Sequence, residues 1–166
     1  PYPGGPQISK ASAKTSSSSF KFPRPMINTN CYDFSFSGLK THVTQSVNKN
    51  ILTEELISNI AFDFENAILD VLISKTLRAA IDLNVDNIVI SGGVSANKRL
   101  RERFENEKRN KNIFFPDIAF STDNGAMIAY MGYLKYHKDI KSSLEINPNP
   151  SSRLAWQKVN NVLLMC

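Results

Sequence analysis

The sequence has few of the residues that build disulfide or local metal sites. It contains two cysteines, Cys31 and Cys166, and two histidines, His42 and His137, and the members of each pair are far apart. Neither pair shows the short spacing of a zinc motif, an HxxxH helix or an HExxH helix, which excludes a metal site built from local histidines or cysteines. With no signal peptide at its start, the chain is expected in a reducing compartment.

Long apolar runs and an initiating methionine are also missing. No run approaches the roughly 18 apolar residues of a membrane span, so we expect no membrane association. The 166 residues are 42% apolar and 21% charged, which is typical of one soluble globular domain and excludes a disordered tail, a collagen-like repeat or a coiled coil. Because the chain begins with Pro1, we expect it to be a piece of a longer protein.

Positive charge is in excess and lies at one end of the chain. The sequence has 20 Lys and Arg residues against 15 Asp and Glu residues. The net charge of +5 comes entirely from residues 1–50, in which Asp33 is the one acidic residue. This opening segment is either a solvated basic loop or a surface that meets phosphate or an acidic partner.

The first 50 residues predict little regular structure. Proline and glycine cluster at residues 3–6, and two further prolines prevent a helix around Arg24, so residues 1–30 are predicted to be irregular. Residues 33–37 alternate polar and aromatic side chains, which predicts a half-buried strand. A helix is expected from about residue 40 to residue 47.

The rest of the chain predicts alternating helices and strands. Apolar residues at three- and four-residue spacing predict one long helix from Thr53, its N-cap, to about Leu83, with a break near Ser74 as an alternative. The remaining elements are expected in this order: a strand at 88–90, a helix at 95–108, a strand at 113–115 and a helix at 126–136. This order indicates an α/β fold in which helices connect the strands of one sheet.

Gly92 and Gly93 stand between the first strand and the helix that follows it. Glycine lets the backbone approach a ligand closely, and a helix N-terminus favours phosphate or ribose oxygens. Asn97, in the first turn, offers both a donor and an acceptor to hydroxyl groups. The same residues also fit a tight connection between strand and helix that binds no ligand.

Asp123 occupies the corresponding place after the second strand. As the N-cap of the next helix it has a purely structural role. As a carboxylate at a strand end it faces the crevice in which open α/β sheets bind ligands, together with the Gly92-Gly93 segment, and supplies one metal ligand.

The helix between the two strands is rich in basic residues. Seven lysines and arginines and three glutamates lie between residues 98 and 111. Such a helix either follows a nucleic-acid backbone or is a solvated surface of mixed charge.

Five blocks of sequence, in one order, resemble a known family. They are PYPGGPQI at 1–8, FKFPRPM at 20–26, DFSFSGLKT at 33–41, IVISGGVSANKRLRE at 88–102 and FFPDIAFSTDNGAMIAY at 114–130. Together they resemble the C-terminal half of the tRNA threonylcarbamoyladenosine transferases, the TsaD/Gcp family formerly known as O-sialoglycoprotein endopeptidases. The blocks cover most of residues 1–146.

The resemblance implies a fold, an activity and partners. The fold is similar to the actin and Hsp70 ATPases, with two ribonuclease H-like lobes, of which this chain is the second. The family transfers a threonylcarbamoyl group from threonylcarbamoyl-adenylate to N6 of the adenosine next to the anticodon, in tRNAs that read codons beginning with A. The implied partners are tRNA, accessory proteins of this pathway and the missing N-terminal lobe. The implied location is the cytoplasm or, in a eukaryote, an organellar matrix.

The resemblance also assigns roles to individual residues. Asp123 matches the metal-binding Asp of the family, whose two histidine ligands belong to an HxxxH helix in the missing lobe. The metal is one divalent ion, iron or, as the alternative, zinc. Gly5 and Asn97 match adenylate-binding positions, and Gly92 and Gly93, in the same motif as Asn97, are assigned to the adenylate with it. No catalytic side chain is identified in this portion.

These assignments lead to specific expectations for the chain. Residues 1–30 form an irregular segment at the cleft, residues 31–146 form the α/β lobe, and residues 147–166 form a tail. Without the first lobe, the chain is expected to be inactive and to self-associate. Four phenylalanines lie in segments expected near the exposed edge, and some of them are expected to be unusually exposed or covered by a second chain: Phe20, Phe22, Phe34 and Phe36.

Three other functions stay open. A non-catalytic paralogue of the same modification complex is a dimerising scaffold, but the intact motifs around Asn97 and Asp123 argue against it. A metallopeptidase needs a site such as HExxH, which this sequence lacks. An actin-like sugar kinase needs a catalytic Asp in the first lobe.

One departure weakens the adenylate contacts, because Ser9 stands where some family members have an acidic residue.

Overall fold

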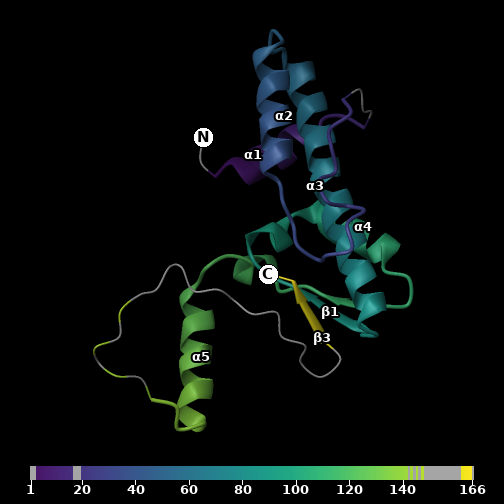
Figure 1. The fold of residues 1–166 in the computed structure, drawn as a ribbon. Coiled ribbons are helices and arrows are strands. Elements are labelled where there is room, and N and C mark those ends of the chain that lie inside the picture. Colours follow the sequence, from purple (N-terminus) through teal and green to yellow (C-terminus); the bar gives the residue numbers. More distant parts are fainter. Residues whose placement is uncertain are drawn as a thin grey trace.

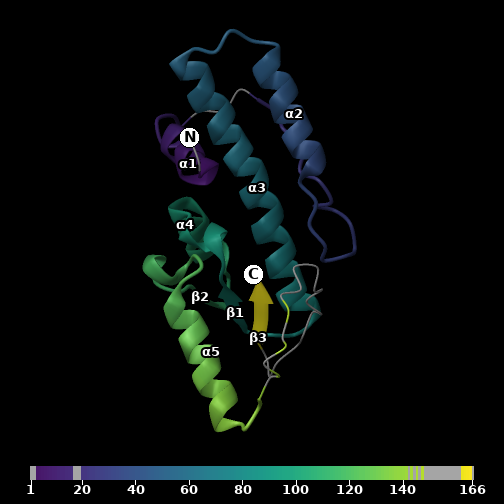
Figure 2. The ribbon, with the colours of Figure 1, turned by 90° about the vertical axis from the view of Figure 1, so that its left-hand side faces the viewer.

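One long helix organises the part of the chain that the computed structural model describes, which is residues 3–16, 20–141, 143, 145 and 147 and the backbone of a strand at 162–165. This helix, α3 (Glu54–Asp82), runs through the middle of the helical layer in Figure 2. Thr53 is its N-cap, as predicted, and Thr53 Oγ1 accepts a hydrogen bond from the Leu56 N–H at 3.2 Å. The helix continues past Ser74, so the alternative of a break there is wrong.

α3 is buried on several sides rather than along one apolar stripe. Two helices, α1 (Gly4–Ser12) and α2 (Ser37–Asn48), lie on either side of it in Figure 2. Its C-terminal half packs on the first strand and on α4 (Lys98–Glu107) in one apolar cluster: Leu69, Leu72, Ile73, Ala80, Val85, Ile88, Ile90, Leu100 and Phe104. Its N-terminal half packs on α2 in a second cluster: Phe22, Leu39, Ile60 and Ala67.

The sheet contains three parallel strands in the order β2-β1-β3. The central strand β1 (Asn87–Ile90) pairs with β2 (Asn112–Phe114), and Ile88 lies opposite Ile113. These two strands confirm the predicted elements and their place in one sheet. The third strand, β3 (Val162–Met165), was not expected from the sequence. It belongs to the segment predicted as a tail, most of which lies outside the described residues, as does Cys166.

The opening segment contains a helix that the sequence did not predict. Residues 1–30 were expected to be irregular, but Gly4–Ser12 forms α1 and packs on α3. Pro6 occupies the first turn of α1, where a backbone N–H has no partner within the helix, so proline is tolerated there. The prediction is therefore wrong for α1. The proposed domain boundaries at residues 30 and 146 stay a prediction.

Residues 20–31 form neither a helix nor a strand, yet polar contacts tie them to α3. The Phe20 N–H donates to the Asp63 carboxylate at 2.8 Å, and Arg24 Nε donates to Asp70 at 2.9 Å. The buried Lys75 Nζ donates to the Met26 carbonyl at 2.9 Å. This segment therefore packs against its own lobe.

The predicted strand at residues 33–37 is also wrong, because this segment has no ladder partner and α2 begins at Ser37. Its two aromatic side chains still point to one side. The rings of Phe34 and Phe36 stack with centroids 6.4 Å apart and pack against the apolar cluster of β1 and α4. The alternation thus reports burial of the phenylalanines and not strand pairing.

The last described helix, α5 (Gly125–His137), confirms the predicted helix at 126–136. A 3₁₀ turn, η2 (Ile118–Phe120), precedes it. α5 extends away from α1, α2 and α3 in both views (Figures 1 and 2). Among the described residues, no helix is both long and apolar enough to cross a membrane.

Candidate functional site

The connection between β1 and α4 is a 3₁₀ turn, η1 (Gly93–Ala96), and not the start of an α-helix as predicted. Gly92 precedes it with φ 84°, a left-handed conformation that other residues rarely adopt, so glycine is required here. Gly93 is exposed, and a Cβ added to it would meet no atom within 4 Å. The backbone of this connection is therefore open to a ligand from solvent.

Asn97 caps α4 and uses both ends of its side-chain amide. The Leu100 N–H donates to Asn97 Oδ1 at 2.8 Å, which makes Asn97 the N-cap. Asn97 Nδ2 donates to Ser9 Oγ at 3.0 Å and to Glu65 Oε1 at 2.7 Å. Asn97 thus has the structural role of a cap and, at the same time, joins α4 to α1 and α3.

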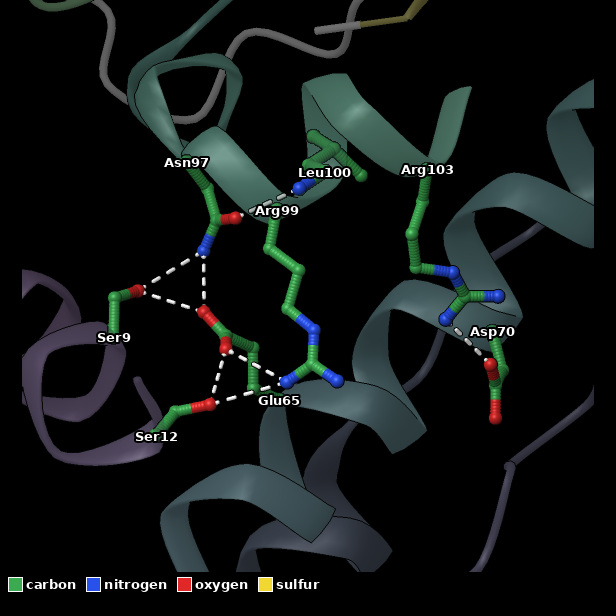
Figure 3. A network of polar contacts seen from close by, with 8 residues as sticks. All are labelled: Ser9, Ser12, Glu65, Asp70, Asn97, Arg99, Leu100 and Arg103. Atoms are coloured by element: carbon green, nitrogen blue, oxygen red, sulfur yellow. Dashed lines mark hydrogen bonds and ion pairs between the residues drawn. The ribbon is translucent and has the colours of Figure 1, made fainter. Parts of the chain in front are cut away.

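Glu65 is the centre of this network, as Figure 3 shows. Its carboxylate accepts hydrogen bonds from Ser9 Oγ at 2.7 Å, Ser12 Oγ at 2.6 Å and Asn97 Nδ2 at 2.7 Å. Arg99 lies 3.5 Å from the second carboxylate oxygen. The Glu65 side chain is 8% exposed, so this is a nearly buried carboxylate that is saturated by donors from two other helices.

The surroundings of Glu65 favour its ionised form. Burial is the largest single influence and acts to raise the pKa, but the hydrogen bonds from Ser12, Asn97 and Ser9 and the charge of Arg99 together outweigh it. The net result is a pKa below the usual value for glutamate. The carboxylate is therefore charged at neutral pH.

Gly5 lies in the first turn of α1, four residues before Ser9. It is exposed, and a Cβ added to it would meet no atom within 4 Å. Because Ser9 and Asn97 both contact Glu65, the structure joins the helix that carries Gly5 to the start of α4. Two of the segments predicted to contact the adenylate are thus linked through α3.

Asp123 lies in the loop between η2 and α5, and its side chain is exposed. The alternative role as N-cap is wrong, because Asn124 takes it: the Met127 N–H donates to Asn124 Oδ1 at 3.0 Å. The Asp123 carboxylate is thus not used to cap α5. Within the described ranges, no three His, Cys, Asp or Glu side chains come together as a metal site. A crevice shared by Asp123 and Asn97 stays a prediction.

The basic side chains of α4 largely point to internal partners. Arg101 donates to the carbonyls of Ser95 and Pro116 at 2.7 and 2.6 Å. Arg103 pairs with Asp70 at 2.7 Å, and the Arg99 guanidinium lies 4.1 Å from the ring centre of Phe62. These contacts favour the structural reading of the basic helix over contact with a nucleic-acid backbone.

Sequence reasoning identified Asn97 but missed Glu65 and its serine partners. Glu65 is separated from Asn97 by 32 residues and from Ser9 by 56 residues, so no local spacing connects them. The one available signal was the three-residue spacing of Ser9 and Ser12, which places both hydroxyls on one side of a helix. The predicted irregular start concealed that signal.

Comparison with known proteins gives a consistent result. The profile of a family described as tRNA N6-adenosine threonylcarbamoyltransferase matches residues 1–130. A protein of that name from Thermosipho africanus (strain TCF52B) is 46% identical over 152 residues, which are 89% of this chain and 46% of that protein. One from Persephonella marina (strain DSM 14350 / EX-H1) is 41% identical over 167 residues, 98% of this chain and 47% of that protein. The chain thus spans about half the length of these relatives.

Proposed function

This chain belongs to the tRNA N6-adenosine threonylcarbamoyltransferase family, and we propose that it forms the C-terminal lobe of an enzyme with that activity. The enzyme transfers a threonylcarbamoyl group from threonylcarbamoyl-adenylate to N6 of the adenosine next to the anticodon, in tRNAs that read codons beginning with A. One observation carries the proposal, namely the family match over residues 1–130. That range includes every residue assigned to substrate or metal: Gly5, Gly92, Gly93, Asn97 and Asp123.

The proposed lobe is of the ribonuclease H-like type found in actin and Hsp70 ATPases. A parallel sheet in the order β2-β1-β3, with helices between its strands, supports this assignment. The coverage of 46% of a relative leaves room for a first lobe of similar size. We propose that the two-lobed protein acts on tRNA, together with the accessory proteins, in the cytoplasm or in an organellar matrix. We also propose that this chain alone is inactive.

In this proposal the adenylate lies against the segment from Gly92 to Asn97. The left-handed Gly92 and the exposed Gly93 leave backbone open at the carboxyl end of β1, where α/β sheets bind ligands. Asn97 Oδ1 accepts one hydrogen bond from the Leu100 N–H and keeps a second lone pair for a hydroxyl donor. Gly5 contributes open backbone from the first turn of α1.

The metal site is shared in this proposal between the two lobes. Asp123 supplies one oxygen ligand, and two histidines outside this chain supply the others. An iron or zinc ion held by these residues would supply Lewis-acid chemistry, namely polarisation of the carbamoyl carbonyl and stabilisation of the leaving phosphate. The described residues by themselves fit one ligand and not a complete site.

The test is threonylcarbamoyl transfer to unmodified tRNA by the complete two-lobed protein, with threonine, bicarbonate, ATP and the accessory proteins. Asp123→Ala is expected to lower transfer at least about 100-fold, since a bound metal contributes several kcal/mol to such a step. Asp117→Ala is the matched control, because this exposed carboxylate lies just before η2 in the same β2–α5 connection and its side chain makes no capping hydrogen bond. Normal transfer by Asp123→Ala would remove Asp123 from the metal site.

The same assay separates the alternatives. A scaffold paralogue gives no transfer by itself but restores transfer when it is added to a second, catalytic family member. A metallopeptidase cleaves a protein substrate and leaves tRNA unmodified.

A further inference from the structure

Three segments meet at the Glu65 carboxylate, and two of them carry residues assigned to the adenylate. α1 brings Ser9 and Ser12 to Glu65, and the start of α4 brings Asn97 (Figure 3). Gly5 lies one helical turn before Ser9. The glutamate itself belongs to α3, the best-packed helix of the lobe.

The contacts of Glu65 define which way the Asn97 amide points. Asn97 Oδ1 faces the Leu100 N–H, and Nδ2 faces Glu65 Oε1. A flipped amide would place its NH₂ group against the N–H donor and its oxygen against the carboxylate, so both contacts would become repulsive. Glu65 therefore fixes the one orientation in which Asn97 keeps an acceptor lone pair beside the open β1–α4 connection.

Burying a carboxylate between three helices costs desolvation free energy. Taking an ion out of water costs several kcal/mol, and apolar side chains of similar volume often give equal or greater stability. In this site the cost is offset by three short hydrogen bonds, and every donor comes from a different helix than the acceptor. The gain is geometric, because directional bonds fix donor positions in a way that apolar packing does not.

We propose that Glu65 is a positioning residue of the adenylate site, which orients the side chains of Asn97 and Ser9 and so holds α1 and the start of α4 in the arrangement that binds substrate. The proposal rests on the proposed function. It assigns to Glu65 no contact with the reacting atoms.

The first test is steady-state transfer by the complete protein with the adenylate as the varied substrate. Glu65→Leu keeps the side-chain volume but accepts no hydrogen bond, and we expect KM for the adenylate to rise about tenfold or more, since bonds to a charged group are worth about 1.5–3 kcal/mol. We expect kcat to change less than about threefold, because the lost binding free energy is the same in the ground state and in the transition state. Glu55→Leu, at an exposed position of the same helix, is the matched control and should leave both constants unchanged.

A conservative variant and a double variant separate positioning from folding. Glu65→Gln retains a carbonyl oxygen for Asn97 and Ser9, so KM should rise less than about threefold. Asn97→Ala should raise KM alone, and the combined Glu65→Leu/Asn97→Ala variant should be no worse than Asn97→Ala, because the two residues act as one unit. Additive effects, or a loss of kcat in proportion to unfolded protein with KM unchanged, would overturn the proposal.

A measurement on this chain distinguishes failure of the inference from failure of the proposed function. Failure of the complete two-lobed wild-type protein to transfer to tRNA would remove the proposed function. The ¹H–¹⁵N signals of the Asn97 side-chain amide then decide the role of Glu65. In the wild type we expect two amide protons with well-separated chemical shifts and slow hydrogen exchange. In Glu65→Leu we expect the two chemical shifts to converge and hydrogen exchange to become faster. Signals unaffected by that substitution would show that Glu65 does not orient Asn97.

Discussion

Two helices of this chain are rich in apolar residues, and they lie in opposite environments. α3 buries Leu69 and Ile73, each 1% exposed, in the apolar cluster that it forms with β1 and α4. α5 exposes Ile128 by 69% and Tyr136 by 78%. Other large apolar side chains of α5 are similarly exposed: Met127, Tyr130, Met131 and Tyr133.

The difference shows which apolar surface of the lobe is buried within this chain and which is left exposed. A helix that is apolar all round is typical of a buried position, yet every described residue of α5 except Leu134 is exposed. The four phenylalanines expected at an exposed edge are instead packed: Phe22 is 5% exposed, and Phe20, Phe34 and Phe36 pack on the two core clusters. That prediction is wrong, and a group of large exposed apolar side chains lies instead on α5.

The largest expected effect sets the two helices against each other by truncation. Leu69→Ala should lower the free energy of unfolding by about 2–5 kcal/mol, because it leaves a cavity between α3 and β1. Ile128→Ala on α5 should change it by about 0.5 kcal/mol or less. Denaturant unfolding followed by circular dichroism measures both. Equal losses would mean that α5 is packed in solution.

The second prediction concerns association of the chain. Contiguous apolar surface of this kind is typical of protein contacts, so we expect self-association that depends on concentration. Replacing Ile128 and Tyr136 together by serine should raise the dissociation constant about tenfold or more, which corresponds to about 1.4 kcal/mol. Ile51→Ser is the control, since Ile51 is 90% exposed but lies in the α2–α3 loop. Sedimentation that shows a monomer at all concentrations would contradict the prediction.

The third prediction concerns the pH dependence of the free energy of unfolding that results from the hydrogen bonds around Glu65. The pKa of Glu65 is lower in the folded chain than in the unfolded chain, so its contribution to stability is present above the unfolded pKa, about 4.3, and is lost as pH falls through the folded value. Glu65→Gln should therefore flatten the decline in unfolding free energy below about pH 4.5. α5 contains no Asp or Glu residue, so no carboxylate of that helix contributes to the decline. An identical pH profile for Glu65→Gln and wild type would contradict it.

Local signals in the sequence predicted most of the elements. The N-cap at Thr53, the strand at 88–90 and the helix at 126–136 were each predicted from neighbouring residues, and all three predictions are confirmed. The same local signals did not predict α1, because its glycines disfavour a helix and its stability comes from packing on α3. Contacts across the chain decided that element, and no local pattern reports them.

The candidate site divides in the same way. Asn97 was identified from its place after a strand and two glycines, which is a local pattern. Glu65 was not, because a glutamate on a long helix is most often solvated, and its burial depends on two serines more than 50 residues away. Asp123 was predicted as one metal ligand from its place at a strand end, and the resemblance added the two histidine ligands. The structure adds that Asn124, and not Asp123, caps α5.

The smallest expected effect compares the N-caps of the same two helices. Thr53→Ala removes the bond from the Leu56 N–H and should lower the free energy of unfolding by about 1 kcal/mol, because α3 unfolds together with the core. Asn124→Ala removes the equivalent bond from the Met127 N–H, but α5 stands apart from that core. Asn124→Ala should change the free energy of unfolding of the core around α3 by less than about 0.5 kcal/mol. Its effect should appear instead as faster hydrogen exchange within α5, because a helix without tertiary packing depends on its cap. If Asn124→Ala destabilised the whole lobe as much as Thr53→Ala, α5 would have to be part of the cooperative core, and the contrast between the two helices would not hold in solution.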